Sequence, residues 1–118
     1  MILVDTSVWI DHLRHDNARL AALLDAGQVR SHPFVIGELA CGTLRQRSVV
    51  LELLGKLPTT TPATHGEALA FIQARRLMGR GLGYVDVHLL ASVVLDDARL
   101  WSLDKRLDQV ARALGIAA

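Results

Sequence analysis

Two short apolar runs, each ending at an aspartate, constrain the fold of this chain more than any other feature. Residues 2–4 (ILV) stop at Asp5, and residues 99–103 (RLWSL) stop at Asp104. Brief apolar runs of this kind predict strands that are buried on both faces. Because an open parallel sheet forms its ligand sites outside the carboxyl ends of its strands, we expect both aspartates to reach that edge.

Helical patterns fill most of the remaining sequence. The spacing of apolar residues predicts helices over residues 6–14, 16–27, 33–44, 45–57, 65–81, 84–98 and 104–115. The 84–98 helix is almost entirely apolar, so we expect it to be central. In the 65–81 helix, Leu69, Ile72 and Leu77 should face inward.

Short strands are also expected at residues 29–32 and 116–118, with a turn or an edge strand at 57–64. Strands that alternate with helices predict an α/β fold, with a mainly parallel central sheet of about four to five short strands flanked by helices. The chain has 118 residues, the size of one ordinary domain. No repeat or linker divides it, so we expect a single domain over residues 1–118.

The composition excludes some function classes. The 13 basic and 12 acidic residues nearly balance, so net charge alone does not indicate nucleic-acid binding. Cys41 is the only cysteine, which rules out an internal disulfide and favours a reducing compartment. We expect it to be a small buried side chain. The chain does not begin like a signal peptide, and its longest apolar stretch is too short to span a bilayer, so we expect a cytoplasmic protein.

Four acids stand out by their surroundings. Asp5 and Asp104 follow apolar runs, Asp86 opens an apolar stretch after the GLGYV turn, and Glu38 lies within FVIGELACG. A carboxylate in apolar surroundings needs a partner or a cation, because burying it alone costs free energy. The four acids come from separate elements that an α/β fold can bring to one spot.

A site built from carboxylates alone favours Mg²⁺ or Mn²⁺, which prefer oxygen ligands. A divalent ion in such a site could activate water and neutralise the charge that builds up on a phosphate. Phosphodiester hydrolysis is therefore the natural reaction. Without the ion the acids would repel one another, which predicts raised carboxylate pKa values.

Each acid also has a purely structural interpretation. Asp5 and Asp104 could cap the helices that follow them, and Asp86 could stabilise the start of its own helix. Glu38 could form a salt bridge with an arginine. The joint pattern favours one common site over four separate explanations.

The chain resembles the PIN-domain ribonucleases, and among them the VapC-type toxins of bacterial toxin–antitoxin pairs. The resemblance covers essentially the whole length and rests on the segments ILVDTSVWIDHLR, PFVIGELACG, GYVDVHLLAS and LWSLDKRLDQVA. It puts the four acids on the family's four acidic positions. It also matches Thr6 to the hydroxyl residue after the first acid, and Ser102 to the Ser or Thr two residues before the fourth.

This resemblance implies an endoribonuclease that depends on Mg²⁺ or Mn²⁺. Asp5, Asp86 and Asp104 would hold the metal, directly or through water, and Glu38 would position a water or assist proton transfer. The resemblance also implies a homodimer and a VapB-type antitoxin. The C-terminal segment of that antitoxin would block the active site, while its N-terminal part would bind operator DNA.

Basic residues near the acids are candidates for contacting RNA phosphates. Lys105 and Arg106 directly follow Asp104, and Arg75 and Arg76 precede the GLG loop. A solvated helix surface is the alternative for the second pair. The five histidines show no zinc-type spacing, so none is expected to be a metal ligand.

Two other functions fit parts of the sequence. A non-catalytic domain of the same fold could act only by binding a partner, although the presence of all four acids argues against this. A small metal-dependent phosphatase shares the α/β architecture. Its DxD motif is absent, because Asp5 is followed by Thr6 and Ser7.

Overall fold

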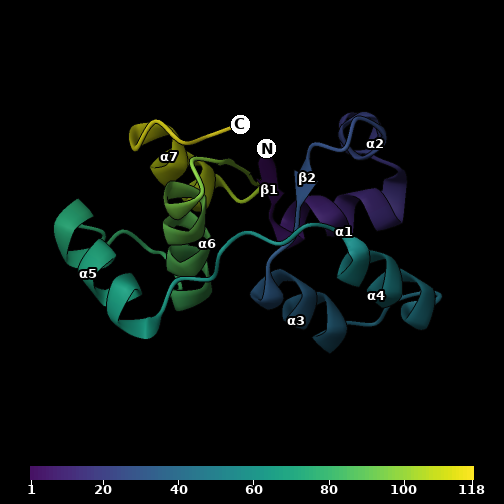
Figure 1. Cartoon of the computed structure of the whole chain (residues 1–118), viewed down its shortest axis with the longest axis horizontal. Coiled ribbons are helices and arrows are strands. Elements are labelled where there is room, and N and C mark those ends of the chain that lie inside the picture. Colours follow the sequence, from purple (N-terminus) through teal and green to yellow (C-terminus); the bar gives the residue numbers. More distant parts are fainter.

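A computed structural model describes residues 1–118 as an elongated molecule with extents of 40, 24 and 23 Å (Figure 1). The strands are β1 (Ile2–Val4), β2 (Val29–Arg30) and β3 (Arg99–Trp101). The helices are α1 (Thr6–His15), α2 (Ala18–Asp25), α3 (Pro33–Cys41), α4 (Arg47–Lys56), α5 (His65–Arg75), α6 (Tyr84–Leu95) and α7 (Lys105–Ala113). None of these helices has the length and hydrophobicity needed to cross a membrane.

The sheet has three parallel strands in the order β2-β1-β3. Leu3, in the middle of β1, pairs with Arg30 on one side and with Leu100 on the other. The α/β class and the parallel pairing are confirmed, but the expected number of strands is wrong. Residues 57–64 and 116–118 contribute one isolated parallel bridge each instead of a strand.

The chemistry of these two segments explains why neither becomes a strand. Pro58 and Pro62 lack a backbone N–H, so the 57–64 segment cannot continue a ladder of hydrogen bonds. Only Thr59 forms a bridge, with Ser31 just after β2. At the other edge of the sheet, Ala117 alone bridges to β3.

All seven expected helices are present, because local signals determine where they start. Asn17 caps α2 by accepting from the N–H of Leu20 at 3.0 Å, and Pro33 is the first residue of α3. The ends of the helices are less regular. For example, α5 ends at Arg75, well before the expected end, since Arg76 adopts a left-handed conformation with φ of 53°.

The central position expected for α6 is confirmed. Its residues from Val87 to Val93 are all buried. The helix packs against β3 and α5, while α1 packs against α2 and α3. Figure 1 accordingly shows α5, α6 and α7 on one side of the sheet and α1 to α4 on the other.

Two side-chain expectations are wrong. Leu69 is 50% exposed, because the side of α5 that packs inward is the one that carries the buried Ala68. Cys41 is exposed at the end of α3. It lies two residues after the buried Leu39 and so faces the opposite side of the helix.

Candidate active site

The carboxyl ends of β1 and β3 meet at one edge of the sheet, and Asp5 lies there. Its backbone N–H donates to the carbonyl of Trp101, the last residue of β3, at 2.9 Å. Asp5 is only 7% exposed, so its carboxylate needs partners. The hydroxyl of Ser102 supplies one by donating to Asp5 Oδ2 at 2.8 Å. Ser102, which the family resemblance matches to the Ser or Thr two residues before the fourth acid, thus contacts the first acid.

Ser7 is a second hydroxyl partner of Asp5, and the sequence motifs did not single it out. Its Oγ donates to Asp5 Oδ2 at 2.7 Å and accepts from the backbone N–H of Leu103 at 2.9 Å. Ser7 therefore ties the start of α1 to the loop after β3. One sequence signal could have identified Ser7: it is a hydroxyl residue in the first turn of a helix, two residues after an acid that ends a strand.

Asp104 joins this network through its backbone. Its N–H donates to Ser102 Oγ at 3.0 Å, and its Oδ1 caps α7 by accepting from the N–H of Leu107 at 3.1 Å. Asp5 caps α1 in the same way, with the N–H of Ser7 at 3.4 Å. The capping interpretation is confirmed for both aspartates, and it coexists with their position at one edge of the sheet.

Glu38 reaches the site from α3. The hydroxyl of Thr6, the first residue of α1, donates to Glu38 Oε1 at 2.8 Å. This contact joins two helices across 32 positions of sequence. The two ion pairs of the chain lie within α4 and α7 and involve none of the four acids. The alternative of a salt bridge between Glu38 and an arginine is therefore wrong.

Asp86 lies in the first turn of α6, where its Oδ2 accepts from the N–H of Gly83 at 3.0 Å. Partial burial raises the pKa of the Asp86 carboxyl, and the hydrogen bond from Gly83 opposes this effect. The negative charges of Asp5, Asp104 and Glu38 raise the same pKa further. The expectation of a raised carboxylate pKa is confirmed at Asp86, which is close enough to the other three acids to respond to each of them.

Each of the four carboxylates uses one oxygen for hydrogen bonds within the chain and leaves the other without such a partner. The engaged atoms are Asp5 Oδ2, Glu38 Oε1, Asp86 Oδ2 and Asp104 Oδ1. Carboxylate oxygens are the ligands that Mg²⁺ and Mn²⁺ prefer, so the donor set fits such an ion. No group of three Asp, Glu, His or Cys side chains is arranged to hold an ion directly. Mg²⁺ commonly keeps several waters between itself and the protein.

Arg106 lies beside the loop that leads to Asp86. A Cβ atom added to Gly81 would lie 3.0 Å from Arg106 Cδ and 3.1 Å from its Nη1. The arginine side chain therefore passes directly beside the backbone of Gly81. Lys105, at the start of α7, is exposed to solvent. Both basic residues that follow Asp104 are thus available to an anion at the edge of the sheet.

Arg75 and Arg76 are more distant from the acids. They lie at the C-terminal end of α5, which packs on α6 on the side away from the sheet (Figure 1). Arg75 extends over the ring of Phe71, with its Cζ 5.5 Å from the ring centroid. Folding does not bring this pair together with the four acids.

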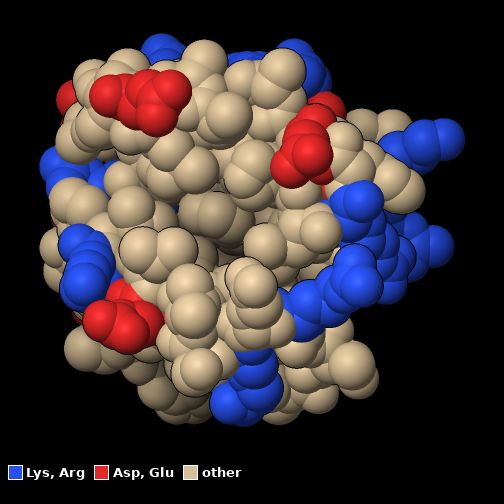
Figure 2. Space-filling view, turned by 90° about the vertical axis from the view of Figure 1, so that its right-hand side faces the viewer, with Lys and Arg blue, Asp and Glu red and all other residues tan.

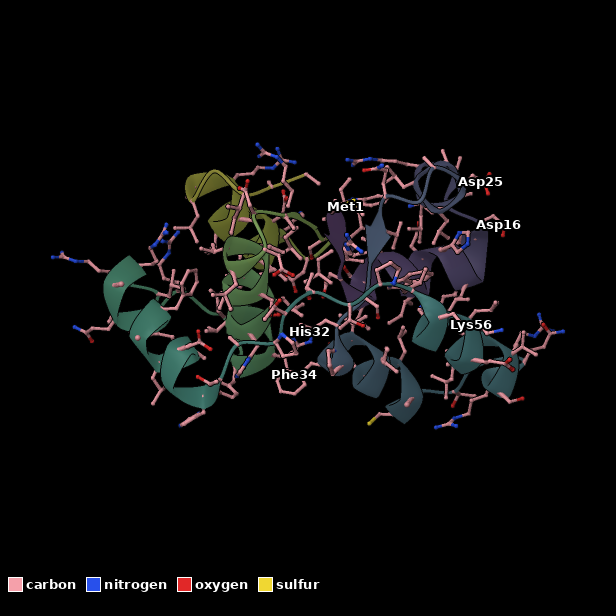
Figure 3. All side chains as sticks on the ribbon, viewed as in Figure 1. Met1, Asp16, Asp25, His32, Phe34 and Lys56 are labelled. Carbon is pink, nitrogen blue, oxygen red and sulfur yellow. The ribbon has the colours of Figure 1, made fainter.

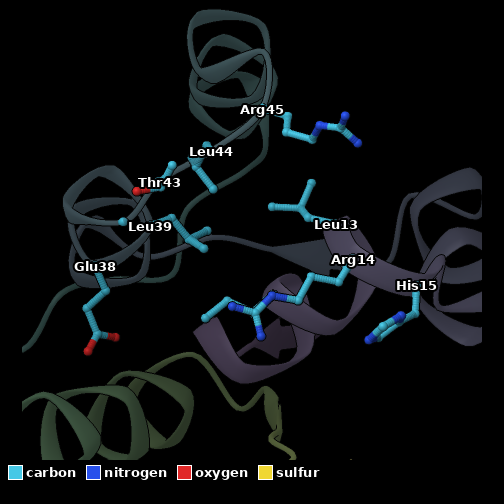
Figure 4. Close-up of a pocket in the computed structure, with 10 residues that line it drawn as sticks. Leu13, Arg14, His15, Glu38, Leu39, Thr43, Leu44 and Arg45 are labelled. Atoms are coloured by element: carbon cyan, nitrogen blue, oxygen red, sulfur yellow. The ribbon is translucent and has the colours of Figure 1, made fainter.

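A cavity of about 570 Å³ lies between α1 and the region joining α3 to α4, with Glu38 at its edge (Figure 4). Its apolar lining consists of Ile10, Leu13, Leu39 and Leu44. Arg14, His15 and Arg45 also line it. Figure 2 views the end of the molecule that carries α1, α2 and α4, and it shows Lys and Arg gathered along one side of a broad uncharged area.

The similarity to known proteins agrees with this arrangement. The PIN domain family model matches residues 2–113, a span that contains all four acids. The chain is 53% identical over 118 residues to Ribonuclease VapC32 of Mycobacterium tuberculosis, in strain CDC 1551 / Oshkosh and in strain ATCC 25618 / H37Rv. Each alignment covers 99% of this chain and 95% of the relative. The chain therefore belongs to the PIN-domain family and, within it, to the VapC-type ribonucleases.

Proposed function

We propose that this chain is a toxin that hydrolyses internal phosphodiester bonds of RNA with Mg²⁺ or Mn²⁺, and that residues 1–118 act as one PIN domain. The observation that carries the proposal is the convergence of the four acids: Ser102 links Asp5 to Asp104, and Thr6, the residue after Asp5, bonds to Glu38. Asp86 is partly buried and feels the charges of the other three acids. Such a cluster is unfavourable without a cation. The 53% sequence identity to a ribonuclease over the whole chain supports the same reaction.

The acids have separate roles in this proposal. Asp5, Asp86 and Asp104 would hold the ion, directly or through water, since each has one carboxylate oxygen without a hydrogen bond in the chain. When bound, the ion supplies the charge stabilisation and water activation that phosphodiester hydrolysis needs. Glu38 orients the attacking water or accepts its proton through the oxygen that Thr6 does not engage.

Three helix N-termini assist this chemistry. α1 begins after Asp5, α7 begins after Asp104, and Asp86 lies in the first turn of α6. The N-terminus of a helix favours negative charge, because its first N–H groups are free and its dipole is positive at that end. The three N-termini therefore stabilise the ionised carboxylates and the phosphate that is cut.

Basic residues around the site are assigned to the RNA backbone. Arg106, which lies beside Gly81, and the exposed Lys105 contact phosphates next to the cleaved bond. Arg75 and Arg76 contact a phosphate further along the strand, since they lie at the far end of α5.

Cleavage of single-stranded RNA by the purified chain tests the proposal. We expect cleavage with Mg²⁺ or Mn²⁺ and none after chelation. Asp5→Asn and Asp86→Asn should each lower the rate by about 100-fold or more, because each removes a charged ligand while keeping the shape of the side chain. Asp25→Asn, at an exposed acid of α2, is the matched control and should cleave like the wild type.

Calorimetric titration with Mn²⁺ separates catalysis from simple binding. We expect binding by the wild type and by Asp25→Asn, and greatly weakened binding by Asp86→Asn. Cleavage at the wild-type rate by Asp5→Asn would end the site assignment. A chain that neither binds Mn²⁺ nor cleaves RNA would be a non-catalytic binding module instead.

We also propose that the chain acts in the cytoplasm as a homodimer that a VapB-type antitoxin neutralises, and that the antitoxin links it to operator DNA. The cavity beside Glu38 supports an inhibitor at this position, because a segment bound there would reach the acids. Its apolar lining and its basic residues suit an amphipathic segment with acidic side chains. Co-expression with a short DNA-binding protein encoded beside this chain should yield a stable complex with no RNA cleavage.

A further inference from the structure

The hydroxyl of Ser7 joins the first turn of α1 to the segment that follows β3. Its Oγ donates to Asp5 Oδ2 at 2.7 Å and accepts the backbone N–H of Leu103, 96 positions away, at 2.9 Å. In Figure 3, Met1 marks the amino end of β1, and α1 begins beyond the opposite end of this strand. Ser7 therefore lies at the edge of the sheet where β1 and β3 end, and its hydroxyl makes both hydrogen bonds there.

The chemistry of the groups around Asp5 determines which atom donates each hydrogen. A carboxylate only accepts hydrogen bonds, and a serine hydroxyl has a single hydrogen. Ser7 Oγ lies 2.7 Å and Ser102 Oγ 2.8 Å from Asp5 Oδ2, so each hydroxyl gives its hydrogen to Asp5. The 3.3 Å contact between the two serine oxygens is then left without a hydrogen. Each serine instead accepts a backbone N–H, from Leu103 or from Asp104, and so connects it to the same oxygen of Asp5.

As a result, Asp5 has only one oxygen left for a ligand. Its Oδ2 accepts from both hydroxyls and, at 3.4 Å, from the backbone N–H of Ser7. Three donors use up the lone pairs of this oxygen, whereas Oδ1 has no hydrogen bond in the chain. Hydrogen bonds to an ionised carboxylate are stronger than those between neutral groups, so the two hydroxyls fix the orientation of the carboxylate. Asp5 can therefore bind an ion through Oδ1 alone.

Ser7 also holds the segment that leads to Asp104. The side chain of Leu103 is 50% exposed, so its burial does little to fix this segment. The backbone N–H of Leu103 is bound by Ser7 Oγ instead. Asp104 is the next residue, and its Oδ1 caps α7. The position of Asp104 relative to Asp5 therefore depends on Ser7 as well as on Ser102.

We propose that Ser7 is a positioning residue of the metal site. Its hydroxyl leaves Oδ1 as the one oxygen that Asp5 offers to an ion, and it holds the segment that carries Asp104. This inference rests on the metal-dependent cleavage proposed above and adds a residue to that site. Ser7 acts through Asp5 and Leu103 and has no contact with RNA in this role. Loss of a group that orients metal ligands commonly weakens metal binding by about 10- to 100-fold.

Calorimetric titration with Mn²⁺, in the absence of RNA, tests this role. Ser7→Ala removes one donor from Asp5 Oδ2 and the acceptor of the Leu103 N–H. We expect this variant to bind Mn²⁺ about 10-fold or more weakly than the wild type, because Asp5 and Asp104 are less well oriented. Ser7→Thr keeps the hydroxyl and should recover most of the affinity.

Ser48→Ala is the matched control. Ser48 is an exposed serine at the second position of α4, as Ser7 is at the second position of α1, so its loss should leave Mn²⁺ affinity unchanged. Melting curves with divalent ions chelated measure stability separately. A purely structural role of Ser7 would lower the melting temperature of Ser7→Ala without changing its affinity for Mn²⁺. If Ser7→Ala does not fold, as judged by circular dichroism, Ser7→Cys carries the same test, because a thiol is a weaker donor than a hydroxyl.

Weakened binding in Ser7→Ala with recovery in Ser7→Thr supports the proposal. If the wild type and Ser7→Ala bind Mn²⁺ equally well, the positioning role is wrong and the proposed cleavage is unaffected. Equal weakening in Ser48→Ala would also overturn the role, since the loss would then follow from removing a serine at the start of any helix. A wild type that binds no Mn²⁺ would contradict the proposed function itself, and the role of Ser7 with it.

Discussion

The hydroxyl of Ser102, after β3, donates a 2.8 Å hydrogen bond to Oδ2 of Asp5, after β1, across 97 positions of sequence. The same hydroxyl oxygen accepts the backbone N–H of Asp104 at 3.0 Å. One buried side chain therefore holds two proposed metal ligands in a fixed relation. The parallel pairing of β1 with β3 makes this possible, because it brings the residues that follow both strands to one edge.

Replacing Ser102 with alanine should weaken both the fold and the site. The substitution removes a buried partner of Asp5 and leaves the N–H of Asp104 unpaired, so we expect a loss of about 1–3 kcal/mol in the free energy of unfolding. RNA cleavage should fall by about 10- to 100-fold, as for other residues that orient metal ligands. Thermal unfolding and cleavage rates measure the two effects.

Ser92 provides the matched control for this variant. It is a fully buried serine of α6 whose hydroxyl has no hydrogen-bond partner. Ser92→Ala should therefore leave stability unchanged or slightly higher, with normal cleavage. Equal effects of the two substitutions would show that the network around Asp5 has no special role.

Asp86→Asn should stabilise the protein when divalent ions are absent. The folded state raises the pKa of Asp86 above its ordinary value of 3.8, so it binds this proton more tightly than the unfolded chain does. Stability is therefore lost as pH rises from the ordinary pKa through the raised one, and the loss persists above it. The asparagine variant lacks this loss and should melt at a higher temperature at pH 7.

With Mg²⁺ or Mn²⁺ added, the wild type should instead melt at a higher temperature than Asp86→Asn. An ion that binds only the folded wild type stabilises it by about 2.7 kcal/mol at 100 times its Kd. Melting curves of both proteins with and without the ion, at pH 4 and pH 7, check the prediction. A wild type that gains no stability from either ion would contradict it.

Thr6→Val should lower the rate of cleavage with little effect on stability. The variant keeps the shape of threonine but removes the 2.8 Å hydrogen bond to Glu38, a contact on the exposed side of the site. We expect about 10-fold slower cleavage because Glu38 is less well oriented, and a change of about 1 kcal/mol or less in stability. Thr6→Ser keeps the hydroxyl and should retain most activity. A normal rate in Thr6→Val would mean that Glu38 needs no such support.

Gly81→Ala should weaken RNA binding by displacing Arg106. The backbone at Gly81 has φ of +77°, and the added methyl group would lie 3.0 Å from Arg106 Cδ. Loss of one phosphate contact should also reduce the salt dependence of binding, by about 0.7 in the slope of log K against log salt. Filter binding at several salt concentrations measures this slope.

Gly79→Ala separates backbone strain from displacement of the arginine. Gly79 also has a positive φ, +71°, but a Cβ there would meet nothing within 4 Å. Both variants should lose about 1–2 kcal/mol of stability, and only Gly81→Ala should bind RNA more weakly. Equal RNA affinities of the two variants would remove Arg106 from the proposed phosphate contacts.

Local patterns in the sequence were sufficient to locate all seven helices and the three strands that form. These signals determine structure only over a few neighbouring residues. They include capping residues such as Asn17, the proline that opens α3, and the apolar runs before Asp5 and Asp104. Because strands and helices begin and end at such signals, the acids could be placed at strand ends and helix starts. The number of strands could not be predicted. Whether a short segment at the edge of a sheet forms a full ladder of hydrogen bonds or a single bridge depends on how it packs beside its neighbouring strand.

Contacts between side chains that are distant in sequence depended on packing. The hydrogen bonds from Thr6 to Glu38 and from the N–H of Leu103 to Ser7, and the contact of Phe34 with His88, each join elements that no periodicity relates. Their geometry follows from how α1 meets α3 and how α3 faces α6. A pattern in the sequence identifies which residues carry chemistry, but the hydrogen bonds and distances between them exist only once the core has brought those helices together.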